Sequence, residues 1–275
     1  MSCVLHDLLA LLVPPLCAAC LIPLPRAGDV VCGGCRRALP WLRGPQCVRC
    51  ALPLTARHAC PARCQAFDAA WAAVGYAGVA RDLVAALKFR RGRPLADVMA
   101  AQLAAGAPRT LLAGATIVPV PAHPAHVRAR GYDQARLLAG ALARRTDARL
   151  ARPLRRRGPV RSQLGASRAE RLQRGRIYVS VRGPVPARVV LVDDVHTTGA
   201  TLDACTRALR RAGAGEVVAL TWARALPLGS VSTPAGSALT PVNESRTISS
   251  KGSKRLNGGA SYADRGQGPE HPRHG

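Results

Sequence analysis

The sequence predicts an α/β domain built on a parallel sheet flanked by helices, with a small cysteine-rich domain before it and a disordered tail after it. Three observations support this. Apolar strand-like runs alternate with helical stretches between residues 65 and 225, nine of the ten cysteines lie in the first 64 residues, and serine and asparagine collect in the last 50. At 275 residues and 48% hydrophobic, the chain can bury a sizeable core. We place the domains at 1–66, 67–225 and 226–275.

Four cysteine pairs define the first domain. A Cys-x-x-Cys pair places two thiolates on one tight turn, and two such pairs supply the four corners of a tetrahedral zinc site. Four pairs therefore predict two structural Zn²⁺ ions, although spacing alone also allows an interleaved pairing. The simplest assignment joins neighbouring pairs, with Cys17, Cys20, Cys32 and Cys35 for one ion and Cys47, Cys50, Cys60 and Cys64 for the other.

Other readings of these cysteines have less support. Disulfides would need an oxidising compartment, and no sequence feature points to one. His58 could replace a cysteine as a ligand, but an isolated histidine is more often a surface residue. Because protein ligands fill every position, neither site keeps an open coordination position for catalysis. Both sites are therefore predicted to be structural.

The second domain alternates strands and helices. The apolar runs TIVPV (116–120) and RVVLVD (188–193) are predicted strands, whereas GYDQARLLAGALARR (131–145) and GATLDACTRALRRAG (199–213) have helical periodicity. Strands that alternate with helices in this way are typical of a parallel sheet covered by helices.

Two adjacent acids, Asp193 and Asp194, end the apolar run that begins at Val189. A strand that ends in a helix-capping aspartate would explain one acid and leave the second without a role. In open α/β sheets, ligands bind at the carboxyl ends of the strands. Two carboxylates placed there can accept hydrogen bonds from neighbouring ribose hydroxyls.

The segment after these acids is rich in threonine and glycine and leads into the predicted helix. Backbone N–H groups at a helix N-terminus, together with hydroxyl groups, can surround a phosphate at the positive end of the helix dipole. A glycine leaves room where the backbone must approach a ligand closely. The sequence therefore predicts a phosphorylated-sugar site at Asp193, Asp194, Thr197, Thr198, Gly199, Ala200 and Thr201.

The stretch VVLVDDVHTTGATL (189–202) resembles the 5-phosphoribosyl 1-pyrophosphate (PRPP) binding motif of type I phosphoribosyltransferases. The resemblance implies that Asp193 and Asp194 hold the ribose hydroxyls, that the following loop holds the 5-phosphate, and that Mg²⁺ bridges pyrophosphate and sugar oxygens. The variable position of the motif is His196, which we expect to be exposed.

The resemblance extends over residues 1–225 to the ComF family, also known as GntX-like or competence-protein phosphoribosyltransferases. It is carried by the cysteine domain and by YAGVARDLVAALKFRRGRPLA (76–96), PVPAHPAHVRARGYDQARLLA (119–139) and SQLGASRAERLQR (162–174). It implies a type I phosphoribosyltransferase fold preceded by a double zinc ribbon.

The segment after the strand at 116–120 is predicted to be a loop, because two prolines interrupt it. It bears His123 and His126, followed by Arg128 and Arg130. Arginines on a loop are often only solvated, but this loop lies where a pyrophosphate-binding loop is expected. We therefore predict that Arg128 and Arg130 neutralise the leaving pyrophosphate, so that the catalytic candidates are these two arginines with Asp193 and Asp194.

Two functions fit these features. The first is an enzyme, a pentosyl glycosyltransferase that moves a phosphoribosyl group from PRPP, with Mg²⁺, to an acceptor that no residue identifies. The second is a non-enzymatic competence factor for DNA uptake that binds single-stranded DNA or a helicase partner on the same fold. A regulator that senses PRPP is a third reading, but no helix-turn-helix is evident.

The charge of the chain fits either function. The formal net charge is +25, and the segment from Arg128 to Arg188 holds 17 arginines against three acids. A basic surface favours anionic partners, whether phosphate compounds or nucleic acid. The run RRRGPVRSQLGASRAER (155–171) is predicted to be a mobile loop that closes over the site or follows a nucleic-acid backbone. Only Tyr132 and Tyr178 lie near it as stacking platforms.

The chain is expected to be cytoplasmic and not inserted in a membrane. The apolar run at the N-terminus lacks a basic start and is broken by Pro14 and Pro15. No other stretch approaches the roughly 18 to 20 apolar residues that span a bilayer. Residues 226–275 are predicted to be disordered, because their Ser/Gly/Pro-rich composition cannot bury enough apolar surface to offset ordering entropy.

Overall fold

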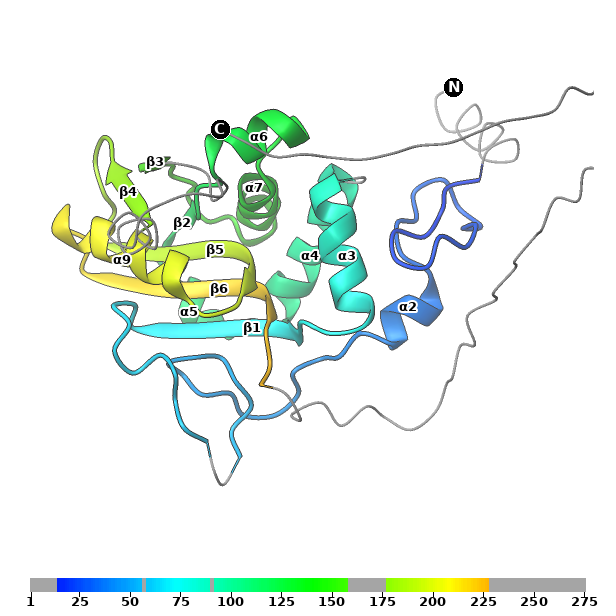
Figure 1. The fold of residues 1–275 in the computed structure, drawn as a ribbon, viewed down its shortest axis with the longest axis horizontal. Helices are drawn as coiled ribbons and strands as arrows, with labels where there is room; N and C mark the ends of the chain where they lie inside the picture. Colours follow the sequence, from blue (N-terminus) through cyan, green and yellow to red (C-terminus); the bar gives the residue numbers. More distant parts are fainter. Residues whose placement is uncertain (1–13, 56–57, 90–91, 158–176, 228–275) are drawn as a thin grey trace, which may run out of the picture. The chain divides into compact units, whose positions relative to one another are not determined.

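The structure is a computed structural model that describes residues 14–55, 58–89, 92–157 and 177–227 (Figure 1). All of these residues belong to one compact unit, residues 1–232. The predicted disorder of the tail from residue 226 concerns a segment almost wholly outside the described residues. The domain boundaries placed at residues 66 and 225 stay predictions.

A four-stranded parallel sheet forms the centre of the fold, as predicted. Its strand order is β1-β6-β5-β2, and every neighbouring pair is parallel. Strands β5 and β6 lie in the middle and read as nearly continuous apolar runs, as expected for strands covered on both faces. The strands are β1 (Ala69–Gly75), β2 (Thr116–Pro119), β5 (Arg188–His196) and β6 (Glu216–Arg224).

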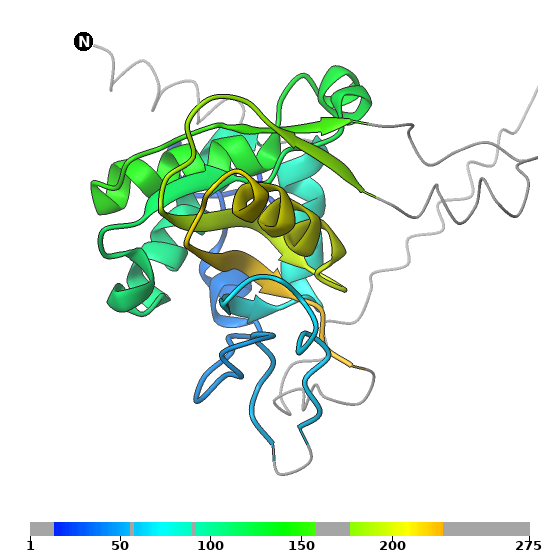
Figure 2. The ribbon, with the colours of Figure 1, turned by 90° about the vertical axis from the view of Figure 1, so that its left-hand side faces the viewer.

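Helices cover both faces of this sheet (Figure 2). Side chains of β5 alternate between the two cores: Val190 and Val192 pack with α3, α4 and α7, whereas Val189 and Leu191 pack with α9. The long helices are α3 (Val79–Phe89), α4 (Gly92–Gly106), α7 (Gln134–Thr146) and α9 (Ala200–Arg211), and the short ones are α2 (Gly33–Arg37), α5 (Arg109–Leu112) and α6 (Pro124–Arg130). Among the described residues, no helix is long and apolar enough to cross a bilayer.

The main boundary difference lies at the end of β5. The strand predicted over 188–193 continues to His196, because its neighbour β6 is equally long and pairs with it as far as His196 and Arg224. Asp194 therefore lies inside the strand together with Asp193, and not beyond its end. Helix α7 begins at Gln134, where the side chain of Asp133 caps it by accepting from the Arg136 N–H.

The segment predicted as a loop after β2 is instead the helix α6. The prolines do not interrupt it, because Pro124 occupies the first turn, where a missing N–H costs nothing. His123 caps the helix with its ring nitrogen, which accepts from the Ala125 N–H at 3.2 Å. Gly131 ends the helix in the left-handed conformation, with φ of 79°.

The arginine-rich segment begins as a strand. Strand β3 (Leu154–Arg157) pairs antiparallel with β4 (Tyr178–Val181) in a separate two-stranded sheet. The first three residues of the predicted mobile loop therefore belong to β3. The rest of that prediction, residues 158–171, lies outside the part of the chain that the structure describes.

The cysteine-rich segment contains the same turn twice, 30 residues apart. Backbone bonds Cys17 N–H to Ile22 O and Cys47 N–H to Leu52 O are both 2.8 Å long. Each turn also carries a non-glycine residue at positive φ, Leu21 at 62° and Ala51 at 58°. The two knuckles are therefore a structural repeat, and corresponding positions in them can be compared directly.

Candidate functional site

The two acids of β5 face opposite sides of the sheet. The Asp194 Oδ2 atom lies 3.1 Å from Lys88 Nζ at the end of α3. Asp193 lies on the α9 side, where its charge acts on the Cys205 thiol. Successive residues of a strand alternate in this way. The two carboxylates thus approach the carboxyl edge of β5 from different faces, and one of them is already paired with a cation.

Asp193 is in an environment that disfavours its charge. Burial, followed by the neighbouring charge of Asp194, raises the pKa of Asp193 well above its ordinary value. Its Oδ1 atom accepts a hydrogen bond from the Asp194 N–H at 2.9 Å, which offsets only part of this cost. Carboxyl groups with a raised pKa occur often at functional sites, and a buried position inside β5 does not fit a helix cap on the surface.

The β5–α9 loop, Thr197–Gly199, presents unpaired backbone donors. Among the described residues, no hydrogen bond uses the N–H groups of Thr197, Thr198 or Gly199. The loop leads into the N-terminus of α9, which is 12 residues long. Free N–H groups at the positive end of a helix dipole can bind an anion. The geometry is thus compatible with the predicted phosphate role of residues 197–201, which stays a prediction.

Gly199 is required by two features of this loop. Its φ of 80° is a left-handed conformation that other residues rarely adopt. A Cβ atom there would also lie within 3 Å of the Gln65 side chain. Close approach to a ligand was the expected reason for a glycine, but the structure places Gln65 of the cysteine-rich segment against it.

The two arginines predicted to act together point to different surroundings. Arg128 lines a cavity of about 390 Å³ between α6 and β3, together with Arg152, Arg155 and Arg156. Arg130 lies over the ring of Phe89, with its guanidinium carbon 5.2 Å from the centroid. Both arginines are on α6, but only Arg128 lines the cavity, whereas Arg130 lies beside Phe89 at the end of α3.

Several basic side chains lie near His126 of α6. Burial lowers the pKa of His126, and the nearby charges of Arg130, His123, Arg156 and Lys88 lower it further. These groups come from α3, α6 and β3, which are far apart in sequence. The end of α3 is also tied to the segment after α6, because the Tyr132 hydroxyl donates to Leu87 O at 2.6 Å. We call the four residues that act on His126 the basic wall; one of them, Lys88, is paired with Asp194.

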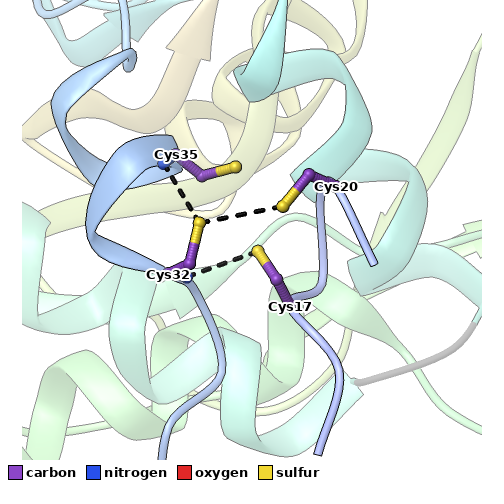
Figure 3. A group of neighbouring side chains, drawn as sticks. All are labelled: Cys17, Cys20, Cys32 and Cys35. Atoms are coloured by element: carbon purple, nitrogen blue, oxygen red, sulfur yellow. Dashed lines mark hydrogen bonds between the residues drawn. The ribbon is translucent and has the colours of Figure 1, made fainter. Parts of the chain in front are cut away.

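The first predicted cluster forms from Cys17, Cys20, Cys32 and Cys35 (Figure 3). Their sulfur atoms all lie within 4.8 Å of one another. Backbone N–H groups donate to sulfur, with Cys32 N to Cys17 Sγ and Cys35 N to Cys32 Sγ both at 3.3 Å. Although burial opposes ionisation, backbone N–H groups lower the pKa of Cys17 to about 6. A buried thiolate held among three other sulfur atoms fits a structural Zn²⁺ site.

The second cluster has a different composition from the one predicted. Its ligand atoms, again within 4.8 Å of one another, come from Cys47, Cys50, His58 and Cys60. The His58 Nε2 atom lies 3.5 Å from Cys50 Sγ, so His58 is not a plain surface residue. Cys64 is outside this group and exposed. A Cys₃His set also fits structural Zn²⁺. The three-residue gap before Cys64 was the only sequence signal that this cysteine differs from the others.

His196 is buried and not exposed as expected. It is 1% exposed, and its ring meets Phe67 edge-on at 5.9 Å between centroids. Neither ring nitrogen has a hydrogen-bond partner among the described residues. Burial, helped by the charge of Arg224, lowers the pKa of His196 to about 3. The extension of β5 to residue 196 explains the difference, because it pairs this position with Arg224 of β6.

Comparison with known proteins identifies the first part of the chain. A family model described as a double zinc ribbon domain matches residues 8–65. This match confirms the predicted zinc-ribbon domain. No curated protein matches the chain.

Among solved structures, the chain is similar to an allosteric regulatory enzyme of purine biosynthesis, with 27% identity over 46% of this chain and 25% of that one and a TM-score of 0.33. It is similar to a glutamine PRPP amidotransferase from B. subtilis, with 26% identity, the same coverage and a TM-score of 0.32. A purine phosphoribosyltransferase from Pyrococcus horikoshii gives 19% identity over 48% of this chain and 78% of that one, with a TM-score of 0.30.

The chain thus covers about a quarter of the first two structures. Because the TM-scores are this low, the chemistry of the site is argued from its own residues and not from these structures.

Proposed function

We propose that the chain binds PRPP together with Mg²⁺ and transfers its phosphoribosyl group to an acceptor. Three features at one edge of the sheet support this: two carboxylates on β5, the unpaired N–H groups of the β5–α9 loop, and the basic wall around α6. They correspond to the three polar parts of PRPP, namely the ribose hydroxyls, the 5-phosphate and the pyrophosphate. The pairing of Asp194 with Lys88, a member of this basic wall, at 3.1 Å is the observation that carries the proposal.

Each part has a chemical role in this proposal. Asp193 and Asp194 accept hydrogen bonds from the ribose hydroxyls, and Thr197–Gly199 bind the 5-phosphate through N–H groups. Arg128 and Arg130 neutralise charge that develops on the departing pyrophosphate. Mg²⁺ supplies further charge neutralisation when it is bound with the substrate, since it prefers oxygen ligands. Catalysis then consists of positioning and electrostatic stabilisation.

Lys88 adds a feature that the sequence motif does not contain. Its ammonium nitrogen lies 3.1 Å from Asp194 Oδ2. A ribose hydroxyl that donates to Asp194 must share this oxygen with Lys88 or displace it. The lysine is also near enough to α6 to contribute to the positive potential there. We propose that it keeps Asp194 in place until the sugar binds.

Calorimetric titration with PRPP and Mg²⁺ tests the proposal. We expect the wild type to bind, and we expect the Asp193→Ala/Asp194→Ala double variant to lose at least about tenfold in affinity, since two hydrogen-bond acceptors for the ribose hydroxyls are removed. The matched control is Asp97→Ala, an acid paired with Arg144 on the surface and not part of the site. A wild type that does not bind PRPP would remove the proposed function.

A separate measurement distinguishes an enzyme from a binding protein. Release of pyrophosphate is followed after addition of nucleobases as candidate acceptors. Turnover by the wild type that is lost in Arg128→Ala, while PRPP still binds, supports transfer. Binding of PRPP without release of its pyrophosphate in the presence of any acceptor would indicate a PRPP-binding protein and not an enzyme.

A further inference from the structure

The cysteine-rich segment is joined to the β5–α9 loop by a buried arginine. Arg224, at the end of β6, is 4% exposed. Its Nε atom donates to the carbonyl of Cys50, a residue of the second cluster, at 2.7 Å. Its Nη1 atom donates to the carbonyls of His196 at 2.8 Å and Thr197 at 2.5 Å. One guanidinium thus connects a metal-ligand residue with two consecutive peptides of the loop.

A second connection runs through Gln65. Its Nε2 atom donates to the carbonyl of Thr198 at 2.6 Å. The Gln65 backbone is held in turn by Arg49, which lies between the two cysteines of the second knuckle and donates to Gln65 O at 2.7 Å. Arg49 also donates to the carbonyl of Asp68 at 3.0 Å. The position of Gln65 therefore depends on the second knuckle as well.

Together these contacts anchor three consecutive carbonyls, those of His196, Thr197 and Thr198. In a trans peptide, the C=O of one residue and the N–H of the next point in opposite directions. Fixing these carbonyls on one side therefore turns the N–H groups of Thr197, Thr198 and Gly199 to the other side, where none has a partner among the described residues. Consecutive N–H groups aligned in this way form an anion-binding concavity.

We propose that the second metal cluster, through Arg224 and Gln65, holds the β5–α9 loop in its anion-binding conformation. Arg224 and Gln65 are positioning residues, because they act through the loop and not on the ligand. The buried guanidinium also adds a positive charge beneath the loop. This inference deepens the proposed function, since it concerns the control of the same phosphate site by the metal state of the zinc ribbon.

The repeated knuckles supply a matched pair of variants. Cys47→Ser removes a ligand from the second cluster, and Cys17→Ser removes the equivalent ligand from the first, for which no described contact reaches the β5–α9 loop. Gln65→Ala breaks one anchor without touching either cluster. Metal analysis of each purified protein establishes how many ions are lost.

Two readouts are measured on these proteins. The first is the backbone order of Thr197 and Thr198, from nitrogen relaxation of protein labelled on threonine. We expect wild-type order parameters near 0.85, as in rigid backbone, and a fall below about 0.6 in Cys47→Ser and Gln65→Ala but not in Cys17→Ser. The second is affinity for ribose 5-phosphate, which we expect to fall about tenfold in the same two variants, because a preorganised site is lost.

The outcomes separate this inference from the proposed function. If the wild type does not bind ribose 5-phosphate, the phosphate site fails, and the order parameters alone decide whether the second cluster holds the loop. Unchanged order at Thr198 in Gln65→Ala would overturn the inference, even if Cys47→Ser does not fold. Equal loosening of the loop in Cys17→Ser and Cys47→Ser would overturn it too, because the effect would then be general.

Discussion

At the scale of single residues, the raised pKa of Asp193 makes the free energy of unfolding depend on pH. Burial and the charge of Asp194 raise that pKa. The folded state then binds a proton more tightly than the unfolded chain, so stability falls as pH rises above the unfolded value of about 4, and the loss is complete above the folded pKa. We expect Asp193→Asn to increase the free energy of unfolding at pH 8, with a gain that vanishes near pH 4.

Urea denaturation of the two proteins across this pH range measures the effect. The same substitution is expected to weaken PRPP binding, since an amide offers one acceptor oxygen in place of two. If the variant is no more stable than wild type at pH 8, ionisation of Asp193 does not lower the free energy of unfolding.

His196 gives a pH dependence of the opposite sign. Its pKa is lowered to about 3, so it stays neutral in the folded state while the unfolded chain takes up a proton below about 6.5. Stability is therefore lost as pH falls below that value, with a limiting slope of about 1.4 kcal/mol per pH unit. His196→Phe retains a ring against Phe67 and removes the titrating group.

We expect this variant to lose stability less steeply than wild type between pH 6.5 and 5 in urea denaturation. Any release of metal at low pH affects both proteins. The difference between their slopes of stability against pH therefore reports the protonation of His196 alone. Identical slopes would mean that His196 gains a proton without opening the fold.

At the scale of elements, the junction between β5 and α9 depends on Gly199. An alanine there must adopt φ near 80° and also meet Gln65. The left-handed conformation costs roughly 1–2 kcal/mol for a residue with a Cβ, and the contact with Gln65 adds to it. We expect Gly199→Ala to lower the free energy of unfolding by at least about 1 kcal/mol.

The double variant Gln65→Ala/Gly199→Ala separates the two contributions in urea denaturation. Removing the glutamine relieves the contact and leaves the backbone strain, so the glycine substitution should cost less in that background. Equal costs in both backgrounds would show that Gln65 moves aside freely.

The sequence was sufficient to predict elements that are encoded by neighbouring residues. The strand β5, the helices α7 and α9, the first cluster of cysteines and the three cysteines of the second cluster follow from apolar periodicity and spacing. The helix α6 was missed because its prolines were taken as interruptions, although Pro124 in the first turn is compatible with a helix.

The remaining differences depend on contacts between distant segments. His196 is buried because β6, which follows it in sequence, pairs along the whole of β5. His58 enters the second cluster, and Gln65 reaches Gly199, only once the cysteine-rich segment folds. No periodicity of the chain encodes such long-range contacts, and this is why the loop's anchors were not predicted.

At the scale of the whole molecule, the net charge of +25 favours binding to polyanions, so binding to single-stranded DNA is tested directly. Arg155 and Arg157 are exposed on β3. If single-stranded DNA follows this strand, replacing both by serine should weaken binding and reduce the slope of log affinity against log salt by about 0.7 for each lost phosphate contact. Filter binding at several salt concentrations measures this.

The control replaces two exposed arginines elsewhere, Arg109 and Arg145, which line a different cavity. The change in net charge is the same, so a specific path along β3 predicts a smaller effect for the control. Equal effects would indicate that only overall charge matters, and binding that ignores salt would exclude a contact with the phosphate backbone.

The bonds of Arg224 also limit how this protein can be divided or recombined. A shortened chain that starts at residue 67 would keep the sheet but lose the Cys50 carbonyl, leaving a buried guanidinium N–H with no acceptor. The ribbon is therefore not a module that can be exchanged freely with that of another protein. Any gene fusion, deletion or domain swap at this boundary must carry the second knuckle along with the sheet, or supply a substitute acceptor for the arginine.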